Sequence, residues 1–199
     1  MIFTKTEIKV LELFVSEILN SFTIREVSRK IKKDLKIVHT SIKNLIKKQF
    51  LIKDKKGIRL NYKIHQKDLT YIENLRKEAF FKKNTLIKIY LNRFIQKAKN
   101  KFFILLIFGS YARNKTNKKS DIDILAIIPK EDGEFERQIK AELSISKLNF
   151  HINLIISESF TEMLHKRDEL NIINETLNNH ILVYGAEQYY ALMGERDVR

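Results

Sequence analysis

The stretch FFILLIFGSYARNKTNKKSDIDILAII, from Phe102 to Ile128, determines the fold of the second half of this 199-residue chain. It opens with an apolar run, residues 102–108, that has no polar face, as expected of a strand buried inside a sheet. Gly109 follows directly, and a glycine there permits a tight turn and a close approach of the backbone to a ligand. A short helical segment and a polar loop then lead to a second apolar strand, residues 122–128.

The turn and the second strand carry residues suited to bind a phosphate and a metal ion. Ser110 places a hydroxyl and backbone N–H groups at the start of the helical segment, where unpaired N–H groups attract anions. Arg113 adds a planar cation suited to phosphate. Asp121 and Asp123 alternate along the strand, so both carboxylates leave the same face, and such oxygen ligands suit Mg²⁺ and substrate phosphates. This combination indicates a nucleotidyl-transfer site.

The chain carries, in this order, Gly109-Ser110-x-Ala112-Arg113 and Ser120-Asp121-Ile122-Asp123-Ile124-Leu125. The ordered pair resembles the signature of the minimal nucleotidyltransferases of the DNA polymerase β superfamily. Either motif alone would be weak evidence, whereas both together behind a buried strand are specific. The competing interpretation is a coincidental turn beside a solvated acidic strand end. The resemblance covers about residues 80–190 and leaves the first part of the chain outside it.

The resemblance implies transfer of a nucleoside monophosphate from an NTP, ATP above all, to a hydroxyl group. Asp121 and Asp123 would be the catalytic carboxylates that hold Mg²⁺ or Mn²⁺. The nucleotide would be bound by turn and loop residues: Gly109, Ser110, Arg113 and Ser120. The family includes antitoxins that nucleotidylylate a partner toxin, so a toxin-like protein is one acceptor that the resemblance implies. A small molecule such as an aminoglycoside is another.

The sequence departs from the family pattern in the strand expected over residues 149–156. Family members carry there a third carboxylate, which completes the metal site and helps to deprotonate the attacking hydroxyl. The matching position holds Asn153, whose amide oxygen can ligate the metal weakly but cannot act as a base. Three explanations stay open. His151 serves as the base, Glu158 swings in from beyond the strand, or the domain binds nucleotide without efficient chemistry.

Composition narrows the class of protein. The chain has no cysteine, which excludes a disulfide framework and a thiolate metal site. It shows no leader pattern and no apolar run long enough for a bilayer, so we expect a cytoplasmic protein without a membrane partner. The net charge of +14 is uneven: residues 1–100 hold 25 Lys and Arg against 9 Asp and Glu, and residues 101–199 hold 13 against 15. This asymmetry favours binding of a polyanion by the first half, although many lysines are also typical of an AT-rich genome.

The sequence pattern of the first half of the chain predicts three helices followed by a β-hairpin. The helix starts are marked by residues able to cap them: Thr6, Ser21 or Thr23, and Asp34. Residues 50–64 predict a hairpin whose tip lies at residues 54–57. This order resembles a winged helix-turn-helix, in which the third helix enters the major groove and the wing follows the backbone.

That resemblance assigns DNA binding to the third helix and the wing, through Lys36, Thr40, Lys43, Lys55, Lys56 and Arg59. Three further residues of the third helix would also face DNA: His39, Ser41 and Asn44. The alternative is a module that mediates only protein contacts or dimerisation, and a homodimer is therefore one of the assemblies we consider.

The remaining elements follow from the same kind of pattern. Residues 66–100 look helical, with a break at Asn84-Thr85. Helices are expected over residues 134–148, 157–166 and 168–179, followed by a short strand over residues 180–185 and a last helix from residue 186. His165 and His180 have no metal-ligand spacing with other histidines, so we interpret them as structural or surface residues.

Together these features predict an α+β protein. An N-terminal winged helix-turn-helix (three helices plus a β-hairpin wing) would precede a nucleotidyltransferase-type mixed β-sheet packed with helices. The expected boundaries are residues 1–66 for the winged helix, 67–84 for a helical connector and 85–199 for the nucleotidyltransferase-like domain. The function is then either NTP-dependent transfer with DNA binding, or DNA-binding regulation with a degenerate transferase domain as nucleotide sensor or dimerisation platform. A purely structural interaction module would bind neither ligand.

Overall fold

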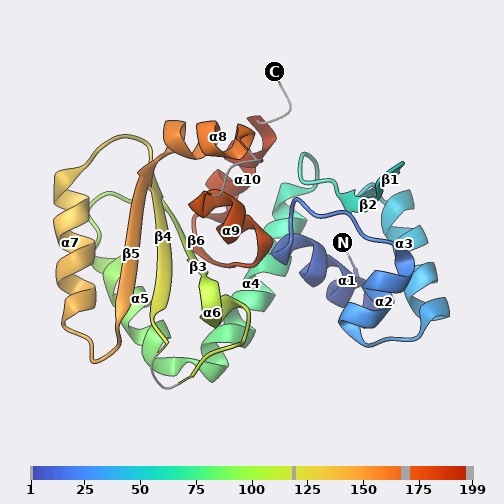
Figure 1. Cartoon of the computed structure of the whole chain (residues 1–199), viewed down its shortest axis with the longest axis horizontal. Helices are drawn as coiled ribbons and strands as arrows, with labels where there is room; N and C mark the ends of the chain where they lie inside the picture. Colours follow the sequence, from blue (N-terminus) through green and yellow to red (C-terminus); the bar gives the residue numbers. More distant parts are fainter. Residues whose placement is uncertain (1, 118–119, 167–170, 196–199) are drawn as a thin grey trace.

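The computed structural model describes residues 2–117, 120–166 and 171–195 of the chain. Its N-terminal part, on the right in Figure 1, contains three helices and an antiparallel hairpin. Their bounds are α1 Lys5–Ser16, α2 Ile24–Ile31, α3 Leu35–Lys47, β1 Leu51–Asp54 and β2 Gly57–Leu60. The predicted order of elements in this part, with the hairpin tip at residues 54–57, is confirmed.

Local capping explains where these helices begin. Thr23 and Glu26 form the predicted capping box of α2, and Asp34 accepts hydrogen bonds from N–H groups of the first turn of α3. The predicted cap of α1 was wrong by two residues. Thr4, not Thr6, is the N-cap, because its N–H donates to Glu7 Oε2 (2.8 Å) while its hydroxyl accepts the N–H of Glu7 (3.2 Å).

The C-terminal part is built on a four-stranded mixed sheet of order β5-β4-β3-β6. The strand bounds are β3 Ile104–Phe108, β4 Ile122–Ile128, β5 Phe150–Ile156 and β6 Ile181–Tyr184. β4 and β5 are parallel, whereas β3 pairs antiparallel with both β4 and β6. The central strand β3 is buried along its whole length, as predicted, but it begins at Ile104, and Phe102 at the start of the predicted run is 70% exposed. The mixed sheet packed with helices is therefore confirmed.

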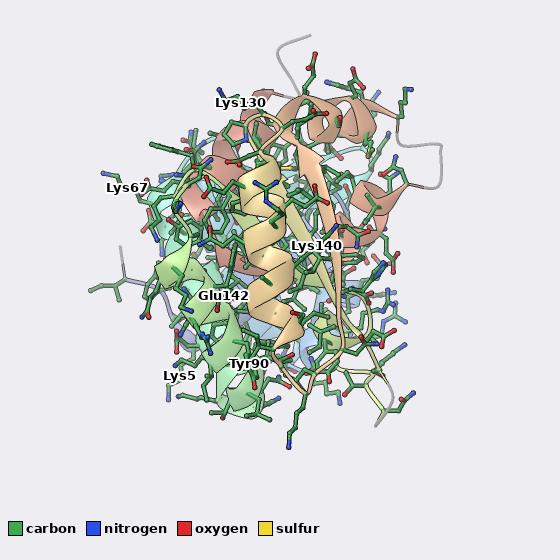
Figure 2. All side chains as sticks on the ribbon, turned by 90° about the vertical axis from the view of Figure 1, so that its left-hand side faces the viewer. Lys5, Lys67, Tyr90, Lys130, Lys140 and Glu142 are labelled. Atoms are coloured by element: carbon green, nitrogen blue, oxygen red, sulfur yellow. The ribbon has the colours of Figure 1, made fainter. Side chains whose placement is uncertain are left out.

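Helices cover both faces of this sheet. The helix bounds are α4 Gln66–Lys83, α5 Thr85–Lys97, α6 Gly109–Ala112, α7 Gly133–Ser144, α8 Ser157–His165, α9 Ile172–Asn178 and α10 Ala186–Glu195. One face packs against α5 and α7, which run side by side and are joined by Glu142 with Arg93 and Lys97 (2.9 and 2.7 Å). Figure 2 views this face, with Glu142 and Tyr90 labelled. The other face packs against α8, α9 and α10.

Several elements are shorter than the sequence predicted. α7 ends at Ser144 rather than at residue 148, because the Ser146 hydroxyl accepts the N–H of Leu148 (3.2 Å) and donates to its carbonyl (2.8 Å), which forms a turn. α9 begins at Ile172 after its N-cap Asn171, and residues 168–170 of the predicted helix lie outside the described residues. The break predicted at residues 84–85 is confirmed, since α4 ends at Lys83 and α5 begins at Thr85.

Helix α4 connects the two parts through a shared apolar core. Its residues Leu69 and Ile72 belong to one buried cluster that contains Phe14 of α1 on one side and Tyr190 of α10 on the other. α4 passes between the N-terminal helices and the sheet in Figure 1. The expected boundaries at residues 66 and 84 fall at the ends of α4, and the three-unit division itself stays a prediction.

A buried polar network also lies on α4. Glu73 is 1% exposed, and it accepts hydrogen bonds from Arg76 Nη1 (2.7 Å) and from the Tyr190 hydroxyl (3.2 Å). Arg76 Nη2 donates to the carbonyl of His180, whose own side chain is fully buried 3.7 Å from Glu73. His180 is therefore a core residue. Of the two roles that we expected for it, structural or surface, the structural one applies.

The network favours an ionised Glu73. Burial alone raises the pKa of this carboxyl, but the Arg76 charge, together with the contact to His180, outweighs it and holds the pKa below the usual 4.5. Because the folded-state pKa is the lower one, the network's contribution to stability is complete above that usual value. It is lost as the pH falls through the folded-state value.

Replacing Glu73 should therefore destabilise the whole chain. We expect Glu73→Ala to lower the free energy of unfolding by about 3–5 kcal/mol, because it leaves Arg76 buried without its anionic partner. Glu78→Ala is the matched control on the same helix. Glu78 pairs with Lys88 at 3.4 Å but is half exposed, so its loss should cost under about 1 kcal/mol. Urea unfolding measures both, and equal costs would contradict the importance of the network.

The described helices include none that is both long and apolar enough to cross a membrane.

Candidate functional site

The turn after β3 packs directly against a carboxylate of β4. Phe108 pairs with Asp123 in the antiparallel register, and Gly109 follows with a φ of +69°, in the left-handed region that favours glycine. A Cβ on residue 109 would overlap Oδ2 of Asp123. The group that this glycine approaches is therefore the chain's own carboxylate, and the predicted close approach of its backbone to a ligand stays a prediction.

Asp121 and Asp123 lie at the start of β4 with different surroundings. Asp121 precedes the strand, which begins at Ile122, and its exposed carboxylate accepts a hydrogen bond from Asn149 Nδ2 (2.5 Å). The Asp123 side chain is 27% exposed, and its Oδ1 lies 3.4 Å from Nδ1 of His151. The two aspartates are therefore held by two residues of the neighbouring strand region, 149 and 151.

The register of β5 decides which of its polar residues lies nearest Asp123. His151 is directly opposite Asp123, whereas Asn153 is opposite Leu125 and donates from Nδ2 to the carbonyl of Ile124 (3.4 Å). Asn153 still lines the same pocket as Asp123 and His151. As a metal ligand, Asn153 stays a prediction.

Glu158 lies at the opposite end of the sheet, so the idea that it swings into the site was wrong. β5 ends at Ile156, which pairs with Ile128 at the far end of β4, and Glu158 follows in α8. The five residue-to-residue steps from Asp123 to Ile128 span roughly 17 Å at about 3.3 Å per step. The parallel pairing of β4 and β5 places the two groups apart, and the sequence alone does not contain that pairing.

An open pocket of about 630 Å³ lies between the sheet and α9. Its lining on the sheet side is Phe108, Asp123, His151 and Asn153, and on the α9 side Asn171, Ile172, Asn174, Glu175 and Asn178. Sequence analysis missed the α9 wall, because nothing in a short helical pattern shows which strand it faces.

Arg113 follows the short helix α6 and contacts α9, which forms one wall of this pocket. Its Nη1 lies 3.4 Å from Oε1 of Glu175, and both side chains are about half exposed. An exposed pair of this kind contributes under about 1 kcal/mol, so an incoming anion can replace Glu175 as the partner of the guanidinium.

The two predicted serines make backbone contacts in the loop. The Ser110 carbonyl accepts the N–H of Lys115 (3.0 Å), which closes the single-turn helix α6. The Ser120 hydroxyl accepts the N–H of Asn117 (2.8 Å). Both residues flank the turn and the start of β4, and their contact with nucleotide stays a prediction.

The donor atoms of this site suit a divalent cation that arrives with a substrate. Two carboxylates at one strand end supply hard oxygen ligands. Within the parts of the chain that the structure describes, no three or more Asp, Glu, His or Cys side chains converge as a complete metal site. Phosphate oxygens and water would therefore have to supply the remaining ligands, as is usual for Mg²⁺ in phosphoryl-transfer sites.

A family model described as "Polymerase beta, Nucleotidyltransferase" matches residues 88–188. The chain belongs to this nucleotidyltransferase family. The match extends from α5 to α10 and contains the whole sheet, the Gly109 turn and both aspartates. No curated protein and no solved structure matches the chain.

The N-terminal part of this nucleotidyltransferase lies outside the family match and presents a basic surface. On α3, the side chains of Lys36, Thr40 and Lys43 are exposed on the face opposite the buried Val38 and Leu45. His39 and Asn44 are exposed as well. Ser41 was assigned wrongly to this face. It is buried, and its hydroxyl donates to the Ile37 carbonyl (3.0 Å).

The hairpin tip adds further cations. Lys55 and Lys56 are exposed, and Arg59 donates from Nε to Asp54 Oδ2 (2.9 Å). The pKa of Asp54 is lowered, first by the N–H of Lys56 and then by Arg59, so the tip contains one fixed negative charge among its cations. These side chains line a concavity of about 680 Å³ together with Lys63 and Ser21.

We expect Gly109→Ala to damage the site by displacing Asp123. Residue 109 has a left-handed φ that alanine adopts only with strain, and the added methyl group would overlap the Asp123 carboxylate. The free energy of unfolding should therefore fall by roughly 1–3 kcal/mol. Gly133→Ala is the matched control, because its φ is ordinary and the nearest atom to a new Cβ is Arg137 Nη1 at 3.9 Å. Thermal unfolding of the two variants measures the difference. A Gly109→Ala protein as stable as Gly133→Ala would contradict the close approach.

Proposed function

We propose that this nucleotidyltransferase binds an NTP with a divalent cation and transfers a nucleoside monophosphate to a hydroxyl group. The observation that carries the proposal is the packing of the Gly109 turn against Asp123 at the mouth of an open pocket. In that arrangement, phosphate-binding backbone and metal-binding carboxylate lie side by side. A transferred phosphoryl group needs both, because its reaction depends on positioning and on neutralisation of charge.

Each residue of the site has a role in the proposed reaction. Gly109 and Ser110 present backbone N–H groups to the triphosphate, Ser120 contacts it from the loop before β4, and Arg113 exchanges Glu175 for a phosphate oxygen. Asp121 and Asp123 hold the cation, which when bound withdraws charge from the phosphate oxygens. The acceptor oxygen bonds to the α-phosphorus, the bond to pyrophosphate breaks, and the hydroxyl proton leaves to water.

The rate of this reaction should be modest. Asn153 offers no base, and a positioned general base typically contributes about 10²–10⁴-fold. Two kinds of acceptor follow from the family resemblance: a toxin-like protein, because the family includes antitoxins that modify a toxin, and a small-molecule hydroxyl. We propose that the protein is cytoplasmic and that ATP is the first nucleotide to test.

Loss of either aspartate should abolish transfer. With labelled ATP, other NTPs, Mg²⁺ or Mn²⁺ and a lysate of the native host, we expect pyrophosphate release and a labelled acceptor. Asp121→Ala and Asp123→Ala should lower the rate at least about 100-fold, since even outer-shell partners of a metal are worth about 10–100-fold. Glu131→Ala, which removes an exposed carboxylate at the far end of β4, is the control. Nucleotide binding without transfer in the unaltered protein would instead support the nucleotide-sensor alternative.

A second function is supported by the basic N-terminal surface. We propose that α1–α3 and the β1–β2 hairpin form a winged helix-turn-helix that binds DNA. The support is the exposed face of α3, with Lys36, Thr40 and Lys43, together with the cationic hairpin tip. Under this proposal α3 enters the major groove, while Lys55, Lys56 and Arg59 contact the phosphate backbone. Were transfer absent, this surface would define the protein as a DNA-binding regulator.

Neutralising two lysines of α3 should weaken DNA binding in a salt-dependent way. We expect Lys36→Ala with Lys43→Ala to reduce the slope of log K against log salt by about 1 for each phosphate that the variant no longer neutralises. Lys130→Ala with Lys140→Ala removes the same charge from the opposite end of the molecule, where Figure 2 labels both residues, and should leave the slope unchanged. Fluorescence anisotropy with duplex DNA at several salt concentrations gives the slopes. An equal reduction in both double variants would indicate unspecific attraction and contradict the assignment of α3.

A further inference from the structure

His151 occupies a position that the proposed transfer reaction leaves without a role. It lies directly opposite Asp123 across the parallel pairing of β4 and β5, and its Nδ1 is 3.4 Å from Asp123 Oδ1. The imidazole is 66% exposed, and it lines the same pocket as Asp123 and Asn153. A metal-binding nitrogen therefore lies beside the carboxylate that is expected to hold the cation.

We infer that Asp123 and His151 form a mixed oxygen–nitrogen cation site, which binds a transition-metal ion such as Mn²⁺ in preference to Mg²⁺. The inference deepens the proposed function and rests on it in one respect, namely that the cation enters the nucleotide pocket. It concerns which ion the site selects, whereas the transfer reaction concerns what the bound nucleotide does.

The separation of the two donor atoms fits one shared ion. Two adjacent ligands that each lie about 2.1 Å from an octahedral ion are about 3 Å apart. The observed 3.4 Å between Nδ1 and Oδ1 requires only a small rotation, which the exposed imidazole of His151 is free to make. Residues 123 and 151 are register partners in a parallel pair, so their side chains also leave the same face of the sheet.

The neighbouring polar groups are less available to the same ion. Asp121 Oδ1 already accepts the short hydrogen bond from Asn149 (2.5 Å), and the Asn153 amide is directed to the carbonyl of Ile124 (3.4 Å). No complete site of three or more acidic, His or Cys ligands exists within the described residues. The second carboxylate oxygen of Asp121, phosphate oxygens of the nucleotide and water would fill the other positions.

The nitrogen ligand determines which ion is preferred. Mg²⁺ takes oxygen ligands almost always, whereas imidazole suits transition-metal ions. Mn²⁺ combines both properties, since it binds carboxylate and phosphate oxygens and also accepts imidazole.

The test is Mn²⁺ binding by the full chain, prepared without a histidine tag. Pulsed electron paramagnetic resonance of the Mn²⁺-loaded protein detects a nitrogen ligand directly through its ¹⁴N modulation, and Mg²⁺ competition measures the preference. We expect ¹⁴N modulation in the unaltered protein and tighter binding of Mn²⁺ than of Mg²⁺. His151→Ala should abolish the modulation and weaken Mn²⁺ binding at least about tenfold, whereas His151→Asp should abolish it and restore Mg²⁺ binding.

His165→Ala is the matched control, because His165 is exposed at the end of α8 and is not among the residues that line the pocket of Asp123 and His151, so both readings should stay unchanged. Both His151 variants should keep the unfolding midpoint, since the side chain is largely exposed. Mn²⁺ binding without ¹⁴N modulation, or with an affinity that His151→Ala does not change, overturns the inference. Nucleotide transfer that continues in such a case leaves the proposed function standing. Modulation without any transfer supports the cation site and removes the transferase.

Discussion

The site depends on the absence of a side chain at residue 109. The turn after β3 can approach β4 closely only because Gly109 adopts a positive φ and has no Cβ to overlap Asp123. This contact aligns the end of β3 with the start of β4, in the register that places Phe108 opposite Asp123. The same contact holds the carboxylate at the mouth of the pocket, next to backbone N–H groups. Backbone N–H groups and a carboxylate are thus brought together by one steric constraint rather than by an attraction between them.

The two parts of the chain are joined by a core rather than by a linker. Helix α4 contributes Leu69 and Ile72 to a cluster that includes α1 and α10, and its buried Glu73 bonds to Arg76 and Tyr190. The same network includes the carbonyl of His180, which follows α9, and α9 forms a wall of the proposed nucleotide pocket. A physical connection thus exists between the proposed DNA-binding surface and the pocket, and it runs through α4.

Local signals in the sequence predicted most of the elements and some of their ends. Thr23 with Glu26 marked the start of α2 because a capping box is a contact between residues three apart, which the sequence shows directly. The choice between Thr4 and Thr6 could not be made in the same way, because both can accept a hydrogen bond and only Thr4 has Glu7 in the reciprocal position. Ser41 was misplaced because it lies three residues after Val38 and four before Leu45, which puts it on the buried face of α3.

The buried strand, the glycine turn and the aspartate pair could all be predicted from the sequence, because each is a pattern over a few neighbouring residues. These patterns were sufficient to identify the nucleotidyltransferase family. Which residues of β5 and α9 meet the aspartate pair depends on the tertiary structure. The β4–β5 register places His151 opposite Asp123 and Asn153 opposite Leu125. Glu158 follows the end of β5 and lies at the far end of the sheet. Strand pairing is a contact between distant segments, and its register depends on packing across both faces of the sheet, which no local pattern contains.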